Sequence, residues 1–291
     1  MMRGARVRAS ITGASLAFPA ALLVLVLMIA PFLMLARDSF NHFDPVAAMQ
    51  SAVTLENYTA FFSDPYYRGI LATTLEVAGV STVLALLLGL PTAYLIARGS
   101  ERLKRICVVL LVLPLLIGSV VRGAGWMILL GHAGILNWLL LKAGWIEQPL
   151  QLLYTRQAVI VATLAAVLPY VILSLQSVLE GVDLSIEEAA QNLGANSWTR
   201  FFRIVSPLAA PGVAAAAMLV FILCMNSYAT PVLLGGNAAA MMAPAVYDQF
   251  SRASDWPFGS AMAVILMLVT LAVALAANRL IHARYVKTML S

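Results

Sequence analysis

The chain has 291 residues, of which 62% are hydrophobic and only 11% are charged. Soluble domains contain about 45–50% apolar and about 25% charged residues, so this composition excludes a water-soluble globule and indicates an integral membrane protein. A net charge of +5 on so apolar a chain also excludes a nucleic-acid-binding surface.

Six runs of the chain are long and apolar enough to cross a bilayer, which requires about 20 residues of helix. The sequence therefore predicts an all-α integral membrane domain over residues 16–281, with short tails at 1–15 and 282–291. The six predicted transmembrane helices are 16–36, 70–97, 106–131, 157–179, 208–234 and 258–281.

Basic residues are distributed unevenly between the two sides of these predicted helices. Twelve of the 18 Lys and Arg residues lie in the N-terminal tail, in the connections 98–105 and 180–207, or at the C-terminal end. The positive-inside rule places these segments in the cytoplasm. Six crossings agree with that placement, so both termini are predicted to be cytoplasmic.

The sequence contains no pattern for catalysis or for cofactor binding. No glycine is followed by lysine, so the chain has no phosphate-binding loop for ATP, and its three histidines are scattered. The two cysteines lie inside apolar runs and have no metal-ligand spacing. We therefore expect no catalytic residues, no cofactor and no metal, and any ATP hydrolysis must come from a partner.

Polar residues inside the predicted spans are the candidates for a solute path, because they are costly to expose to lipid. Glu76 lies about 9 Å inside the outer end of its span, at 1.5 Å per residue. Its carboxylate suits a cationic solute, or else it forms an ion pair with Arg68 or Arg122. In the fifth span, Pro231 is predicted to kink a polar segment and to leave carbonyls open to the path, unless neighbouring helices satisfy them. The candidate path residues are Glu76, Asn226, Ser227, Tyr228 and Thr230.

The cytoplasmic connection 180–207 is polar and amphipathic, unlike the rest of the chain. Ser185 is predicted to cap a first short helix, with Glu188 completing a capping box, and Gly194 to end that helix in the left-handed conformation. A second helix is predicted to start at Asn196 or Ser197. Its apolar stripe comprises Trp198, Phe201, Phe202 and Val205.

Two interpretations of this connection follow from physical chemistry alone. A short amphipathic helix with a sharp bend makes a rigid knob that fits a groove on another protein. The same helix can instead lie on lipid headgroups as an interfacial linker. The residues themselves do not favour one over the other.

The spacing of residues in this connection resembles the EAA loop of permease subunits in bacterial ABC importers. Glu188, Ala189 and Ala190 are followed after three residues by Gly194, after nine more by Ile204, and after two more by Pro207. Ser206 departs from the family pattern, which usually has Leu before the Pro. In that family the loop forms the coupling helix that sits in a cleft of the ATPase subunit. The residues to which the resemblance assigns ATPase coupling are Glu187, Glu188, Ala189, Ala190, Gly194, Ile204 and Pro207.

Further stretches resemble the permease subunits of spermidine and putrescine type importers. They are 55–62, 113–140, 228–236 and 248–263.

The resemblance implies a type I ABC importer permease fold in a bacterial inner membrane, with lipid around it. The implied partners are two ABC ATPase subunits, a periplasmic solute-binding protein and a second, non-identical permease. The implied function is ATP-driven import of a small solute, with a polyamine as the candidate. A stand-alone secondary transporter is the alternative, and a membrane-embedded enzyme or scaffold is a third class.

Overall fold

The structure is a computed structural model that describes residues 2–46 and 48–290, and within them the side chains of 18–19, 22–46, 48–277 and 279. The described backbone is helical, with an isolated antiparallel bridge between His42 and Gln50. It divides into two compact units. The first contains residues 1–63 and 246–265, and the second contains 64–245 and 266–291.

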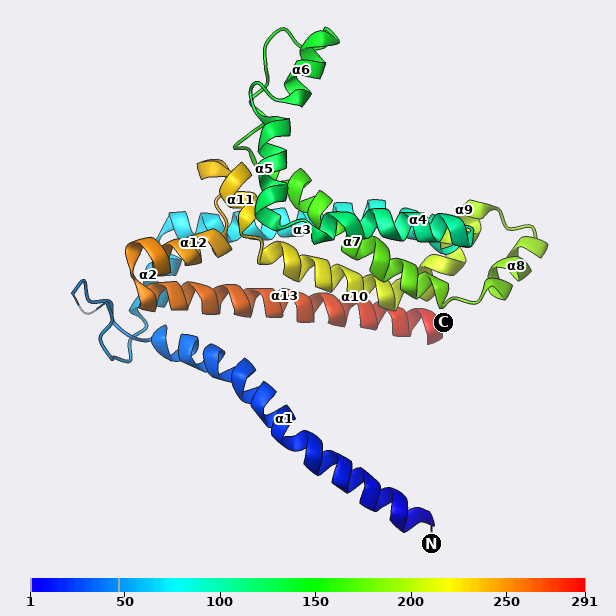
Figure 1. Cartoon of the computed structure of the whole chain (residues 1–291), viewed down its shortest axis with the longest axis horizontal. Coiled ribbons are helices and arrows are strands. Elements are labelled where there is room, and N and C mark those ends of the chain that lie inside the picture. The colour runs from blue at the N-terminus through cyan, green and yellow to red at the C-terminus, as the bar shows by residue number, and fades with distance from the viewer. Residues whose placement is uncertain (1, 47, 291) are drawn as a thin grey trace. The chain divides into compact units, whose positions relative to one another are not determined.

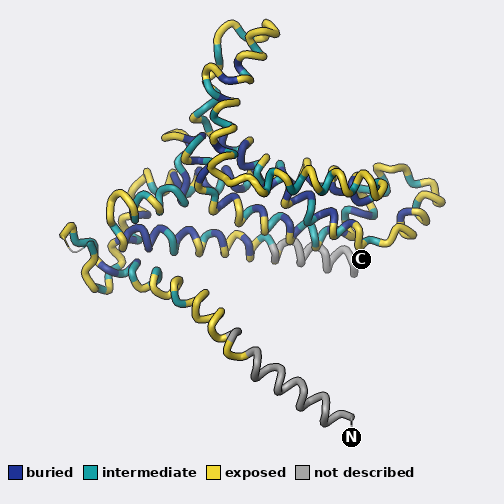
Figure 2. The backbone as a smooth tube through the Cα atoms, viewed as in Figure 1, coloured by how far each residue is buried: buried dark blue, intermediate teal, exposed yellow. Residues whose placement is uncertain are grey.

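The second unit is built on three long apolar helices that run side by side (Figure 1). They are α3 (Pro65–Ala97), α7 (Arg156–Glu180) and α10 (Ser206–Met225). Asp64 caps α3 and Thr155 caps α7, because each side chain accepts a hydrogen bond from a backbone N–H in the first turn. The buried residues lie where these helices face one another (Figure 2), and they include Val77, Val171, Leu175 and Val220.

Shorter elements of the second unit connect and extend the long helices. They are α4 (Glu101–Val112), η1 (Leu113–Leu116), α5 (Ser119–Leu130), α6 (Ile135–Lys142), α8 (Leu184–Asn192), α9 (Ser197–Arg200), η2 (Phe201–Val205), α11 (Ala229–Leu234) and η3 (Gly236–Ala239).

The first unit contains α1 (Met2–Asp38), α2 (Glu56–Ser63) and η4 (Gln249–Ala253). The turn after α1 is fixed by Asn57, whose side-chain amide donates to the carbonyls of Ser39 and Asn41 at 2.9 Å each. Two helices have residues in both units: α12 (Met242–Asp248) and α13 (Trp256–Leu290).

Five helical stretches among the described residues are long and apolar enough to cross a membrane. They are Pro65–Ala97, Ser119–Lys142, Arg156–Glu180, Ser197–Met225 and Trp256–Ala277. The prediction of an all-α protein with several apolar spans is therefore confirmed. The predicted first span, 16–36, falls within α1. The start of this span and the predicted tails 1–15 and 282–291 lie outside the residues whose side chains are described.

Two of the predicted spans are not continuous helices. The span 106–131 is interrupted after η1, where the backbone of Ile117 is extended, and α5 then turns away from α4 (Figure 1). The span 208–234 is interrupted between Met225 and Ala229. The apolar composition of these runs does not reveal where backbone hydrogen bonding stops.

Two glycines allow the long helices of the second unit to approach closely. A Cβ atom added at Gly89 of α3 would lie 2.5 Å from Val171 Cγ1 of α7, and one added at Gly212 of α10 would collide with the side chain of Val178. Lipid is as apolar as these side chains, so close van der Waals packing between small residues is a main source of helix association.

Gly89→Ala is expected to destabilise the bundle, because buried Val171 has no room to retreat. Overpacking of this kind costs about 1–3 kcal/mol. Thermal denaturation of the purified protein in detergent should show a lower midpoint for Gly89→Ala. The control is Gly79→Ala on the same helix, where an added Cβ meets nothing within 4 Å. Equal midpoints for the two variants would contradict this packing.

Candidate functional site

Helix α8 starts after Asp183, whose Oδ1 accepts a hydrogen bond from the Ser185 N–H at 2.9 Å. The hydrogen bonds from the Ser185 backbone and side chain hold the pKa of Asp183 below its ordinary value. The prediction that Ser185 caps this helix, with Glu188 in a capping box, is therefore wrong. An ionised carboxylate two residues earlier accepts the first free N–H and also suits the positive end of the helix.

Gly194 ends α8 as predicted. Its φ of +86° lies in the left-handed region, which disfavours residues that carry a Cβ. The Gly194 N–H donates to Gln191 O at 2.9 Å and the Ala195 N–H donates to Ala190 O at 3.0 Å. This pair of bonds is the Schellman arrangement, which satisfies the last carbonyls of the helix.

The second helix of this segment begins at Ser197, in agreement with the prediction. Asn196 is its cap, because its Oδ1 accepts from the Thr199 N–H at 2.8 Å. The helix then continues through η2, a short π-helical segment, directly into α10. The boundary predicted between the connection 180–207 and the span 208–234 therefore lies inside continuous helix. Pro207 accounts for the π-helical segment, since it has no N–H and its ring crowds the carbonyl four residues earlier.

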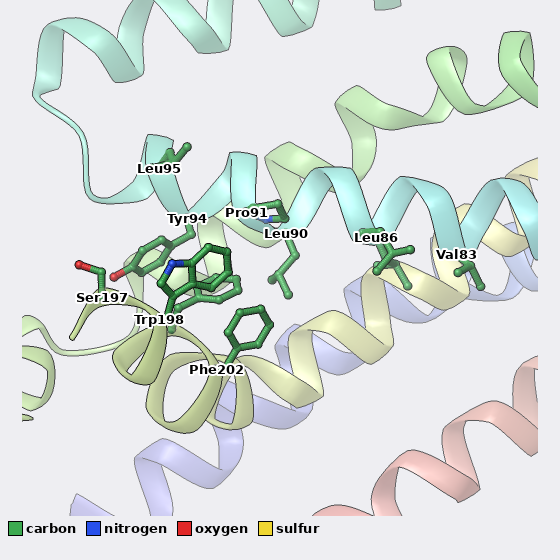
Figure 3. A pocket seen from close by; sticks show the side chains of 11 residues that line it. Val83, Leu86, Leu90, Pro91, Tyr94, Leu95, Ser197, Trp198 and Phe202 are labelled. Atoms are coloured by element: carbon green, nitrogen blue, oxygen red, sulfur yellow. The ribbon is translucent and has the colours of Figure 1, made fainter. Parts of the chain in front are cut away.

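The aromatic residues of this helix form one wall of an apolar groove of about 670 Å³, and the C-terminal half of α3 forms the other (Figure 3). The rings of Trp198 and Phe202 stack with their centroids 5.5 Å apart, and Phe201 meets Tyr94 edge-on at 5.0 Å. Val205 is buried, whereas Trp198 and Phe202 are exposed. The predicted apolar stripe is thus only partly covered within this chain.

The two consecutive acids of α8 lie in opposite environments. Glu187 is only 3% exposed, and it accepts hydrogen bonds at 2.7 Å from Tyr94 Oη and from Arg98 Nε. Glu188 and Ala189 are exposed, Ala190 is half-buried, and Gly194 is exposed. Glu187 therefore contacts Tyr94 of α3 and Arg98, the residue that follows α3. Glu188 and Ala189 of the predicted EAA sequence remain accessible.

Further along the same segment, Ile204 is half-buried and Pro207 is exposed. Arg200 connects the two short helices, because its guanidinium donates to Gln191 Oε1 at 2.7 Å across the Gly194 turn.

Glu76 forms an ion pair with Arg156, the first residue of α7, at 2.9 Å. The partner is therefore neither Arg68 nor Arg122. Both side chains are about half exposed, at 47% and 48%, and Glu76 lines a hollow of about 390 Å³ with apolar residues of α3. Arg156 also donates to Ala238 O at 3.1 Å, so this charge pair joins α3, α7 and the end of η3.

The polar segment of the fifth predicted span lies at the interruption between α10 and α11. Asn226 is exposed, and its amide donates to Ile222 O at 2.9 Å, which satisfies a terminal carbonyl of α10. Ser227 and Thr230 are half-buried, and Tyr228 is 40% exposed.

Pro231 does not cause this interruption, contrary to the prediction. It occupies the first turn of α11, where a missing N–H breaks no helical bond. Helix α11 packs against α5 and α7. The polar segment 226–230 and the Glu76–Arg156 pair therefore both lie next to α7. Within the described residues, no three His, Cys, Asp or Glu side chains gather as a metal site would require.

Sequence reasoning missed three residues that complete these sites: Tyr94, Arg98 and Arg156. Each pairs with an acid about 80–93 residues away along the chain. The only available signal was their position near the ends of apolar runs, where basic and aromatic residues are common for interfacial reasons.

Residues 82–287 match the family described as binding-protein-dependent transport system inner membrane component. The chain is 34% identical over 251 residues to the spermidine/putrescine transport system permease protein PotB of Haemophilus influenzae, covering 85% of each protein. It is also 34% identical to PotB of Escherichia coli, covering 82% of this chain and 86% of the relative. The molybdenum transport system permease protein ModB of Mycobacterium tuberculosis is 27% identical over 232 residues, which are 79% of this chain and 86% of the relative.

Solved structures share the fold at low sequence identity. A chain of the bacterial alginate ABC transporter, crystallised with an alginate pentasaccharide-bound periplasmic protein, has a TM-score of 0.78 at 16% identity and covers 94% of this chain and 95% of its own length. A chain of the methionine ABC transporter MetNI has a TM-score of 0.55 at 19% identity, covering 72% and 92%. By its apolar helices and by these matches, the chain belongs to the family of inner membrane components of binding-protein-dependent transport systems, and it is a multi-pass membrane permease rather than an enzyme.

Proposed function

We propose that this chain is one of two transmembrane subunits of a type I ABC importer that receives a cationic solute from a periplasmic binding protein. The observation that carries the proposal is the accessible EAA sequence on α8, a helix held in place by the buried side chain of Glu187. Two ATPase subunits, bound on the cytoplasmic side, supply the energy. The chain itself contains no phosphate-binding loop.

The proposed coupling surface comprises the accessible residues of α8 and the turn that follows it. Glu188 and Ala189 are exposed, and the left-handed turn at Gly194 fixes the direction of the chain after them. In this proposal Ile204 and Pro207 shape the start of the next helix, and Glu187 holds α8 from within.

The proposed topology has six spans and both termini in the cytoplasm of a bacterial cell. Five of the spans overlap the apolar helical stretches of the described chain, the span 106–131 only from residue 119 onward, and the remaining span is the N-terminal 16–36. The excess of Lys and Arg in the 98–105 and 180–207 connections supports this orientation. The second permease is proposed to be a different chain.

The proposed solute is a polyamine, the class of compound for which the PotB relatives are named. The half-exposed pair of Glu76 and Arg156 supports this choice, since a solute ammonium group can take the place of the guanidinium beside the carboxylate. The proposed path also includes Asn226, Ser227, Tyr228 and Thr230, at the interruption between α10 and α11.

Glu188→Lys and Gly194→Asp are each expected to abolish uptake of radiolabelled spermidine by cells, with normal amounts of the protein in the membrane. The first change reverses a charge on the ATPase-facing surface, and the second puts a side chain where the backbone is left-handed. Uptake and membrane abundance are measured together. Glu101→Lys makes the same charge change at an exposed site on α4 and should transport normally. Unchanged uptake in Glu188→Lys would count against α8 as the coupling helix.

Glu76→Gln is expected to raise the KM for spermidine uptake about tenfold, because one charge-assisted contact with the solute is lost. Arg156→Gln removes the competing cation and leaves the carboxylate, so its KM should not rise. Glu147→Gln, at an exposed site in the connection before α7, serves as the control. If the two changes at the pair raise the KM equally, the pair is structural and Glu76 does not contact the solute.

A further inference from the structure

Three side chains join the proposed coupling helix to the end of α3. Tyr94 is in the last turn of α3, Arg98 is its C-terminal cap residue, and Glu187 is in α8. We refer to Tyr94, Arg98 and Glu187 as the clasp. Glu187 lies 89 positions after Arg98 and 93 positions after Tyr94, so only the fold brings it to the other two residues.

Every contact in the clasp is short, and the two carboxylate oxygens have different donors. Glu187 Oε2 accepts from Tyr94 Oη at 2.7 Å. Glu187 Oε1 accepts from Arg98 Nε at 2.7 Å and lies 2.6 Å from Arg98 Nη2. Nη2 also donates to Val182 O at 3.1 Å, just before α8 begins. The guanidinium therefore holds both α8 and the chain that leads into it.

The clasp is sheltered from water. The side chains of Arg98 and Glu187 are 14% and 4% exposed. Removing one partner of such a pair leaves the other charge buried and uncompensated, which is far more costly than losing a surface ion pair. The two helices are thus held by a contact that tolerates little separation.

Apolar packing contributes little to the position of α8. Leu184 and Ile186 on the helix and Leu193 at its end are all exposed. The clasp is consequently the buried anchor of α8 on the transmembrane helices, and a displacement of α8 must either break the clasp or move α3.

We infer that the clasp transmits the displacement of the coupling helix to α3, which makes Tyr94 and Arg98 positioning residues for energy coupling. This inference rests on the proposed function. Helix α3 is continuous from Pro65 to Ala97 and carries Glu76 eighteen residues before Tyr94, about 27 Å away along the helix. The clasp and the proposed solute-contact residue therefore lie on one element.

Helix α3 also contains Pro91, which removes one backbone hydrogen bond between the clasp and Glu76. Thr92 Oγ1 donates to Leu88 O at 2.7 Å in the same turn. Helix α3 is in extensive contact with α7, and Gly89, two residues before Pro91, lies close to Val171 of α7.

The test uses the complete importer with its binding protein and ATPase subunits in proteoliposomes, with radiolabelled spermidine as the probe. Tyr94→Phe removes one donor to Glu187, and Arg98→Lys keeps the charge but loses the paired donors of the guanidinium. Both uptake and ATP hydrolysis are measured. Spermidine carried per ATP should fall in both variants, and in Arg98→Lys by about 5- to 150-fold, the range of typical coupling energies between sites. The double variant Arg98→Glu with Glu187→Arg exchanges the two charges. It should restore part of the ratio of spermidine carried to ATP hydrolysed that Arg98→Glu alone loses.

A merely structural role would lower the amount of assembled importer and leave the ratio of uptake to hydrolysis unchanged, which would overturn the inference. If Arg98→Lys fails to accumulate, an unchanged ratio in Tyr94→Phe has the same meaning. Glu101→Gln, in the exposed pair with Lys104, is the matched control and should keep the wild-type ratio. Failure of the wild-type importer to show ATP-driven uptake would instead contradict the proposed function.

Discussion

A carboxylate that is removed from water requires a partner, and this constraint determines how the 180–207 segment is attached to the long helices. Glu187 is the acid concerned, and Tyr94 and Arg98 at the end of α3 supply its hydrogen bonds. Because these partners belong to a transmembrane helix, α8 has a fixed base instead of a flexible tether. The exposed residues Glu188 and Ala189 lie on that base, and the turn at Gly194 sets the path of the chain beyond them.

Helix α3 takes part both in the clasp and in the ion pair of Glu76 with Arg156. One end carries the clasp, and Glu76 nearer the other end pairs with Arg156 of α7. Between them, Gly89 lets α3 approach α7 at Val171. In a bilayer the helices gain little from burial alone, so close packing and buried polar contacts must hold them together. A helix joined in this way can move as a unit when one end is displaced.

Sequence reasoning predicted the features that depend on local chemistry. The Gly194 stop and the start of the next helix at Asn196 or Ser197 follow from backbone preferences, and both are confirmed. The choice between two neighbouring residues that can both cap a helix was harder to predict, and Asp183 caps α8 in place of Ser185. The partners of Glu76 and Glu187 could not be predicted, because they lie about 80–93 residues away and only the packing of α3, α7 and α8 selects them. Hydropathy likewise located the apolar runs but gave no sign of the break at Ile117, and the break predicted at Pro231 lies at Asn226 instead, because both breaks depend on backbone hydrogen bonds.

An ATPase on separate subunits is proposed to drive this permease through α8. Reconstitution tests it most directly: spermidine accumulation is measured in proteoliposomes that contain the two permease chains with the binding protein, in the presence and absence of the ATPase subunits and of ATP. Accumulation is expected only when the ATPase subunits and ATP are both present. Accumulation by vesicles that contain this chain as their only transport protein would contradict this proposal.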